Sequence, residues 1–301
     1  MDELTVIAEN LADADRLLEG GWKLRRAQLA ELAAYLQVKL QTESESGEEA
    51  EQALTSLYGE FDEQLGCRVP IAETKEWGRA VSLFTRLELC SALSAGLAPH
   101  RVPDYSEPHP TIAYFQNPYA GRILQCVTDL LPDAEATDAE DYSDACEGVA
   151  EGRYDFCLLP VESAGDGVMN RFARLIDRYD LFTVLICHLE LSEEEYIRFA
   201  LLSASPCKLA GADRMKLRVV PGEDGLWELL LTCQTFGAKT DGCRSLPGEE
   251  TESYELTLRV QTADVSALTR YLELGRSRST VTGYYRQISL PLRNEQELLY
   301  S

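Results

Sequence analysis

The sequence predicts a chain of mixed class, with a helical N-terminal segment, a doubly wound α/β lobe and a C-terminal α+β domain of βαββαβ order. Two near-continuous apolar runs, at 154–159 and 182–187, are typical of strands buried on both faces of a parallel sheet. After residue 207 the pattern switches between strand-like alternation and helical spacing. The three parts are expected at 1–108, 109–206 and 207–301.

The N-terminal segment is predicted to be helical because its apolar residues recur at steps of three and four. Further helices are expected at about 50–65 and 74–95, and the run at 100–110 holds three prolines, as expected of a linker. One apolar stripe consists of Leu29, Leu32, Ala33, Leu36 and Leu40.

The middle segment alternates strands with helices. A further strand at Ile197–Phe199 follows His188 too closely for a parallel crossover, which needs roughly a dozen residues or more. The other strands are expected at 111–115, 134–139, 154–159 and 182–187, and the helices at 120–131, 142–151 and 168–179.

The last segment is predicted to be ferredoxin-like from its element order alone. Its strands are expected at 216–221, 238–245, 253–261 and 280–288, and its helices at 224–236 and 265–274.

Charge limits the possible partners. The chain of 301 residues has a formal net charge of −23, which repels phosphate backbones and anionic lipids. No basic patch offsets this charge, so binding of nucleic acid or of a membrane surface is not expected. A small anionic substrate would need a local cationic pocket.

Cysteine and histidine usage predicts a cytoplasmic protein without metal or cofactor. The nine cysteines are widely spaced and form no Cys-x-x-Cys pair, which favours reduced thiols. Two of the three histidines lie in the linker, and Cys187 and His188, adjacent on a strand, should point to opposite faces. No apolar run is long enough to span a membrane, and the acidic start is unlike a signal peptide.

The runs TIAYF, GRYDFCLLPVES and DLFTVLICHLEL resemble the first lobe of prephenate dehydratases. The resemblance implies a role in aromatic amino-acid metabolism. In that family a second lobe precedes a return strand bearing Thr-Arg-Phe, whose threonine is catalytic. Here Ile197-Arg198-Phe199 matches that strand, so the second lobe is expected to be missing and Ile197 to stand in place of the threonine.

Two loops of the lobe could meet a ligand. The first contains Asn117 and Arg122, where the alternative is an ordinary turn. The second, at 160–167, resembles the family's Pro-Ile-Glu-Asn-Ser-x-x-Gly, and its glycines could instead only preserve a turn. From the second loop and the return strand, the catalytic candidates are Glu162, Ser163 and Arg198, and the ligand-binding candidates are Gly165 and Gly167.

The phrase PGEDGLWELLLTCQTFGAKTDGCRSLP resembles the ACT domain, a ligand-sensing module. The resemblance implies that an aromatic amino acid binds against Gly225, Leu226, Trp227, Arg244 and Ser245. The alternative is that these residues pack in a dimer interface. The N-terminal helices resemble chorismate mutase at Arg26, although Gln37 stands where a lysine is expected. An unrelated helical dimerisation segment is the alternative.

The leading hypothesis is a non-catalytic, regulatory or amino-acid-sensing relative of prephenate dehydratase. It would form a homodimer through its ACT and helical domains, with an aromatic amino acid or prephenate as ligand. One alternative is an active prephenate dehydratase, with or without chorismate mutase activity. Another is a structural partner of a pathway enzyme, in which the acidic surface favours a basic partner.

Overall fold

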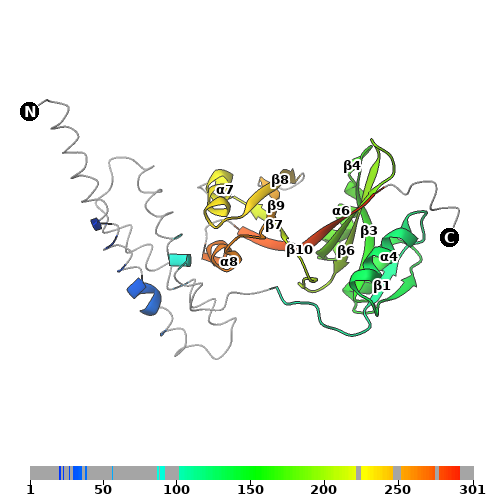
Figure 1. Ribbon diagram of the computed structural model, residues 1–301, viewed down its shortest axis with the longest axis horizontal. Coiled ribbons are helices and arrows are strands. Elements are labelled where there is room, and N and C mark those ends of the chain that lie inside the picture. Colours follow the sequence, from blue (N-terminus) through cyan, green and yellow to red (C-terminus); the bar gives the residue numbers. More distant parts are fainter. Residues whose placement is uncertain are drawn as a thin grey trace, which may run out of the picture. The chain divides into compact units, whose positions relative to one another are not determined.

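The computed structural model describes residues 102–221, 225–246, 252–274 and 278–291, together with scattered positions before residue 92 (Figure 1). Each scattered position is helical, and Ala33 and Leu87 among them are buried. The remaining predictions for the N-terminal segment lie outside the described residues, including Arg26, Leu29, Leu36, Gln37, Leu40 and all of the helix at 50–65 except residue 56.

The chain divides into two compact units. One contains residues 1–101, 222–232 and 264–278, and the other contains residues 102–221, 233–263 and 279–301. The second unit holds every strand of the described residues, except the first residue of the last one.

The strands of the second unit form one ten-stranded sheet in the order β2-β1-β3-β6-β5-β10-β7-β9-β8, with β4 paired to β3. The strands are β1 Thr111–Tyr114, β2 Glu135–Asp138, β3 Phe156–Ser163, β4 Gly167–Val168, β5 Phe182–Glu190, β6 Tyr196–Ser203, β7 Arg214–Val220, β8 Lys239–Leu246, β9 Ser253–Arg259 and β10 Arg278–Leu290. The helices of this chain region are α4 Ala120–Leu130, α5 Tyr142–Ala150, α6 Asn170–Arg178, α7 Gly225–Thr235 and α8 Val265–Leu274.

Strand direction corrects one prediction. β1 is parallel to both β2 and β3, as expected, but β6 lies antiparallel between β3 and β5. The lobe is therefore a mixed sheet. A turn of residues 191–195 joins β5 to β6, and the Leu191 N–H donates to the Glu195 carbonyl at 2.9 Å. This short connection permits only an antiparallel return.

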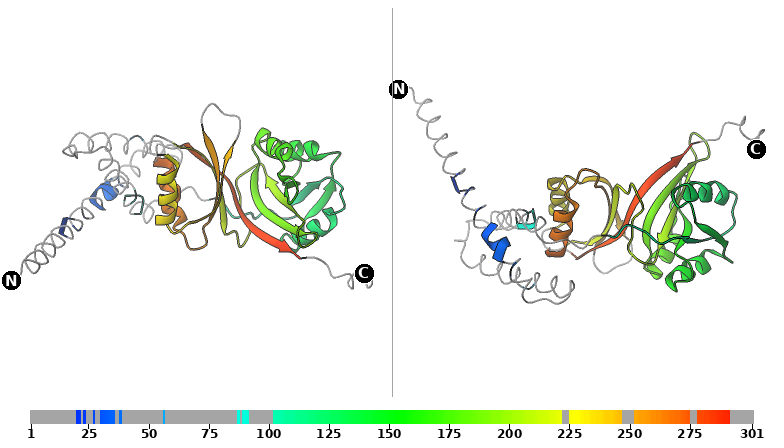
Figure 2. Two further views of the ribbon diagram at one scale, coloured as in Figure 1. Left: turned by 90° about the horizontal axis from the view of Figure 1, so that it is seen from above. Right: turned by 60° about the horizontal axis from the view of Figure 1, so that its bottom comes forward.

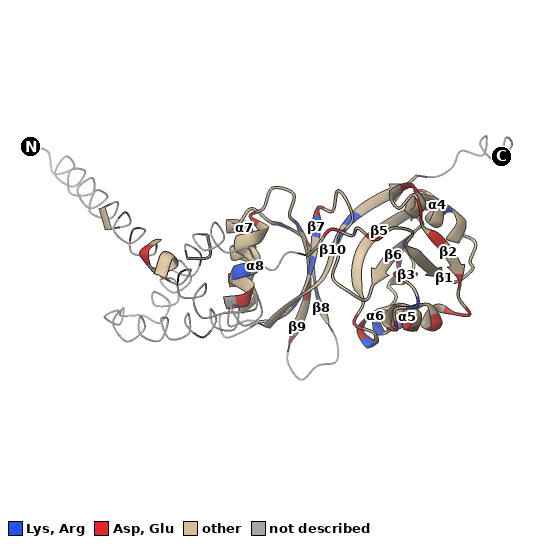
Figure 3. Cartoon of the chain, turned by 90° about the horizontal axis from the view of Figure 1, so that it is seen from below, with Lys and Arg blue, Asp and Glu red and all other residues tan. Residues whose placement is uncertain are grey.

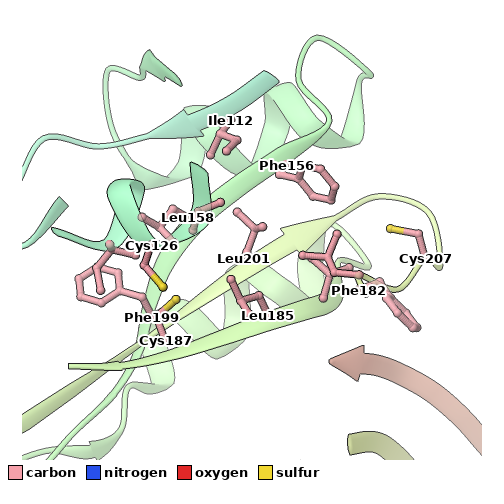
Figure 4. Close-up of a cluster of buried hydrophobic side chains, with 14 of the residues drawn as sticks. Ile112, Cys126, Phe156, Leu158, Phe182, Leu185, Cys187, Phe199, Leu201 and Cys207 are labelled. Atoms are coloured by element: carbon pink, nitrogen blue, oxygen red, sulfur yellow. The ribbon is translucent and has the colours of Figure 1, made fainter. Parts of the chain in front are cut away.

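Helices cover both faces of the lobe, as predicted for a doubly wound fold. α4 lies on one side of the sheet, and α5 and α6 lie on the other (Figure 3). The α4 side buries Ile123 and Val127 against Phe156, Leu185 and Phe199 (Figure 4 shows this cluster). The opposite side buries Ala145, Cys146, Leu159, Phe172 and Ile186. Successive residues of β3 and β5 point to opposite faces of the sheet, and both faces are buried. The runs predicted at 154–159 and 182–187 are therefore almost wholly apolar.

β10 belongs to both halves of the sheet. It lies next to β7, and from Gly283 onward it pairs in parallel with β5 (Figure 2). A Cβ at Gly283 would lie 2.9 Å from the Thr183 Cβ and 3.4 Å from the Lys216 Cβ. Gly283 therefore lets β10 pass between β5 and β7 at a distance that no other residue allows.

The C-terminal elements follow the predicted chain order βαββαβ, and their strands are arranged β10-β7-β9-β8. β9 pairs antiparallel with both β7 and β8. The residues of α7 and α8 lie largely in the other compact unit, where the Tyr271 hydroxyl donates to the buried Glu228 carboxylate at 2.5 Å.

The described cysteines are all free thiols, and only Cys243 among them is exposed. Cys126 on α4 and Cys187 on β5 face one another within the core (Figure 4). Cys67 lies outside the described residues. Within the part of the chain that the structure describes, no helix is long and apolar enough to cross a membrane.

Candidate functional site

Four neighbouring strands place polar side chains in one row across the sheet, which we call the polar row: Glu162, Arg198, His188 and Ser289. Strand register sets Glu162 opposite Arg198, Arg198 opposite His188, and His188 beside Ser289. The row lies near the carboxyl ends of β3, β5 and β10. In open α/β sheets this is the edge at which ligands bind.

Arg198 is the centre of the polar row. Its Nη1 lies 2.9 Å from Oε2 of Glu162, and its Nε donates to Nδ1 of His188 at 3.1 Å. The Tyr196 hydroxyl donates to Oε1 of Glu162 at 2.7 Å. The three bonds form one continuous network and fix the orientation of each side chain in it.

Tyr196 adds an aromatic surface beside the row. Its ring stacks on His188 with centroids 4.8 Å apart, and the Arg198 guanidinium carbon lies 5.2 Å from its centroid. The hydrogen bond to Glu162 raises the pKa of the Tyr196 phenol, with a smaller contribution from burial. The phenol is therefore protonated at neutral pH.

The network is open to further partners. The Arg198 and Glu162 side chains are 33% and 24% exposed, so a ligand could reach both. Two hydrogen bonds leave most N–H donors of the guanidinium available. Because Nδ1 of His188 accepts a hydrogen bond, the neutral ring carries its proton on Nε2. Among the described residues, no group accepts from that Nε2.

The loop predicted at 160–167 is a strand end and a tight hairpin instead. β3 continues through Ser163, and Ser163 pairs with Gly167 on β4. The Ser163 hydroxyl is hydrogen-bonded to the Asp166 carboxylate at 3.2 Å and accepts from the Asp166 N–H at 3.1 Å. Ser163 thus stabilises the turn, Gly167 has a φ of 62° there, and Gly165 is exposed.

Asn117 and Arg122 also make structural contacts. Oδ1 of Asn117 accepts from the Tyr119 N–H at 2.9 Å, and its Nδ2 donates to the Phe115 carbonyl at 2.9 Å. Nη2 of Arg122 donates to the Pro291 carbonyl at 2.8 Å, at the end of β10. These bonds match the alternative of an ordinary turn, and the structure brings neither residue into the polar row.

The candidates of the C-terminal domain lie on two different elements. Gly225, with a φ of 78°, begins α7; Leu226 is half-buried and Trp227 is 65% exposed. Arg244 and Ser245 lie on β8, where Nη2 of Arg244 is 3.0 Å from Oε1 of Glu255 and Ser245 is exposed. Their roles as ligand contacts stay predictions.

Sequence reasoning named Glu162 and Arg198 but missed His188, Tyr196 and Ser289. His188 and Cys187 do lie on opposite faces, as predicted, since Cys187 is buried in the core and His188 reaches Arg198. The short connection between β5 and β6 is the sequence signal that could have revealed His188, because a hairpin at that point pairs His188 with Arg198. Nothing in the sequence placed Ser289 beside His188, since β10 follows β5 by about a hundred residues.

The described residues contain no group of three or more His, Cys, Asp or Glu side chains placed to hold a metal ion. The polar row itself offers one carboxylate and one imidazole, and the imidazole already accepts a hydrogen bond from Arg198. The chemistry that the row can perform is binding of polar and charged groups, with the Tyr196 hydroxyl beside it as a further hydrogen-bonding group.

No family model and no curated protein matches this sequence. Prephenate dehydratases are among the solved structures that are similar to the chain. The structure from Streptococcus mutans has 16% sequence identity and a TM-score of 0.48, over 59% of this chain and 98% of that one. One from Arthrobacter aurescens, in complex with L-Phe, has 12% identity and a TM-score of 0.44, over 58% of this chain and 89% of that one. A third structure, GqqA, described as a novel type of quorum quenching acylase, has 19% identity and a TM-score of 0.44, over 58% of this chain and 94% of that one.

Proposed function

We propose that the protein is a non-catalytic, amino-acid-responsive relative of prephenate dehydratases, acting in the cytoplasm. The observation that carries this proposal is the turn at 191–195, the only chain between β5 and β6. A cleft enzyme needs walls that exclude water from the reacting groups. This turn is too short to supply a second lobe, so the polar row has no such wall from this stretch of the chain.

The residues at the return strand also favour binding over catalysis. Dehydration requires a positioned acid that protonates the departing hydroxyl. Ile197 has no such proton, and Arg198 is already paired with Glu162. The order and pairing of β7, β9, β8 and β10 support an ACT-like domain, and hence a homodimer that responds to an amino acid.

One observation favours an enzyme as the second candidate. Tyr196 presents a protonated hydroxyl next to Ile197, hydrogen-bonded to the Glu162 carboxylate. If the protein were a dehydratase, this phenol would be the proton donor in the polar row. Turnover abolished by Tyr196→Phe would establish that function.

Two measurements on the purified full-length chain test the proposal. We expect no turnover of prephenate or chorismate, and a higher Tm with one of L-phenylalanine, L-tyrosine or L-tryptophan. A ligand at 100 times its Kd stabilises by about 2.7 kcal/mol, which raises Tm by several degrees at this size. Turnover would contradict the non-catalytic part of the proposal. A Tm unchanged by all three amino acids would contradict the amino-acid response and favour the alternative, a structural partner of a pathway enzyme. Ser245→Leu tests the predicted ACT contact separately.

A further inference from the structure

The polar row carries one positive and one negative charge side by side, on Arg198 and Glu162. We propose that this pair binds a zwitterionic α-amino acid, with Arg198 holding the carboxylate and Glu162 the ammonium group. The inference rests on the amino-acid response proposed above and names a site for it, in the lobe and not in the C-terminal domain.

Hydrogen-bonding capacity supports this assignment. Arg198 retains donors after bonding Glu162 and His188, and a planar guanidinium suits a carboxylate. Each Glu162 oxygen accepts one hydrogen bond and has a second lone pair for an ammonium donor. The proton on Nε2 of His188 and the exposed Ser289 hydroxyl are two further groups at the same sheet edge.

Charge selects a zwitterion over a dicarboxylate. Glu162 neutralises the one cation of the row, and the chain as a whole has a net charge of −23. A dianion such as prephenate would leave at least one carboxylate without a cation and beside Glu162, at a cost in desolvation and repulsion. An α-amino acid instead presents two opposite charges a few ångströms apart, in the same arrangement as the pair.

The row can accept such a ligand at low cost because it is already ordered. Strand register holds Glu162 opposite Arg198. The hydrogen bond from Tyr196 fixes the Glu162 carboxylate, and the hydrogen bond to His188 fixes the Arg198 guanidinium. Partly exposed ion pairs contribute little to stability, so their partial replacement by ligand charges costs little. Preorganisation of this kind increases affinity, since less side-chain entropy is lost on binding.

The test begins with the twenty L-amino acids, screened by Tm and titrated by calorimetry against the full-length chain. The best ligand is then compared with its α-hydroxy acid, which lacks the ammonium group, and with its amine, which lacks the carboxylate. We expect each analogue to bind at least tenfold more weakly than the amino acid.

Three variants assign the site. Arg198→Gln should weaken amino-acid binding at least tenfold. Glu162→Gln should do the same, while tightening binding of the hydroxy acid. Glu190→Gln is the matched control, because it removes a carboxylate opposite Tyr196 without touching the pair, and it should change Kd by less than twofold. Circular dichroism and Tm establish that each variant is folded.

Histidine NMR gives an independent readout in the wild-type chain. Ligand at the polar row should shift the His188 ring nitrogen signals, identified by their loss in His188→Gln. Unshifted signals, or an amino-acid affinity unchanged in both Arg198→Gln and Glu162→Gln, would overturn this site while leaving the amino-acid response intact. Hydroxy acid binding as tightly as the amino acid would overturn the zwitterion. No binding of any amino acid would overturn the proposed function as well.

Discussion

Glu255 on β9 is a carboxylate enclosed by cations. Lys216 lies 3.7 Å away on β7, Arg244 lies 3.0 Å away on β8, and register places Arg218 directly opposite. Burial alone would raise the pKa of Glu255, but Lys216, Arg244 and Arg218 together lower it below its ordinary value. This carboxylate therefore stabilises the fold in its charged form.

The sign of the pH dependence follows from that lowered pKa. The contribution of Glu255 is complete above the unfolded-state pKa, near 4.3 for a glutamate, and is lost as pH falls through the folded-state pKa. We expect Glu255→Gln to lower the free energy of unfolding by about 1–3 kcal/mol at pH 7. Urea titrations of both proteins at pH 7 and pH 3 measure this difference.

The difference should shrink at pH 3, which lies below the unfolded-state pKa near 4.3, because unfolding of the wild-type chain then takes up a proton at this carboxylate. Glu135→Gln on the exposed strand β2 is the control and should change stability by less than about 0.5 kcal/mol at either pH. A Glu255→Gln effect that is equal at the two pH values would contradict the role of charge.

At this scale the sequence predicted residue types better than contacts. Glu162 and Arg198 were named from a motif, but their ion pair depends on the register shift between Pro160 and Glu162, which leaves no mark in the sequence. Ser163, a candidate from the same loop, stands where the motif has asparagine, and it bonds Asp166 within its own turn. Motif position alone therefore could not tell the residue in the network from the residue in the turn.

At the scale of elements, Gly283 is the residue on which the path of β10 depends. A methyl group there would lie 2.9 Å from the Thr183 Cβ and 3.1 Å from the Thr183 carbonyl oxygen. Since a backbone atom is one of the two obstacles, side-chain rotation cannot relieve the clash. We expect Gly283→Ala to destabilise the chain by about 1–3 kcal/mol, measured by urea denaturation.

Gly242 on β8 provides the matched control for this change. A Cβ there would meet only the Thr257 Cβ, at 4.0 Å, so Gly242→Ala should be neutral or slightly stabilising. Equal losses for the two variants would mean that the effect is general to strand glycines and not due to the crossing of β10.

The elements themselves followed from periodicity, whereas their pairing did not. Every strand and helix predicted between residues 111 and 288 is present, most with shifted ends, because the periodicity of buried positions is a local property of the chain. The wholly parallel arrangement was wrong, since β3 and β5 each have one parallel neighbour, β1 and β10 respectively, and one antiparallel neighbour, β6. β4, of two residues, was missed because so short a strand has no period.

At the scale of the whole sheet, β10 makes the lobe and the C-terminal strands one structure. The residues after Gly283 pair with β5, and the strand also lies beside β7. The sequence predicts a domain boundary at residue 206, and a pattern read along the chain cannot reveal a strand shared between distant neighbours. Ser289, which completes the polar row, lies on this shared strand.

Because β10 is a neighbour of both β5 and β7, we expect these two strands to lose their structure together. Opening β10 removes a neighbour from both β5 and β7, so we expect the amides of Val184–Leu189 and Met215–Val219 to exchange hydrogen through one common opening. Gly283→Ala should then accelerate exchange roughly 5- to 150-fold in both strands, as its 1–3 kcal/mol implies. Hydrogen exchange followed by mass spectrometry resolves the two segments. Acceleration confined to β7, with β5 unchanged, would mean that the two halves open independently and that β10 does not couple the polar row to the C-terminal strands.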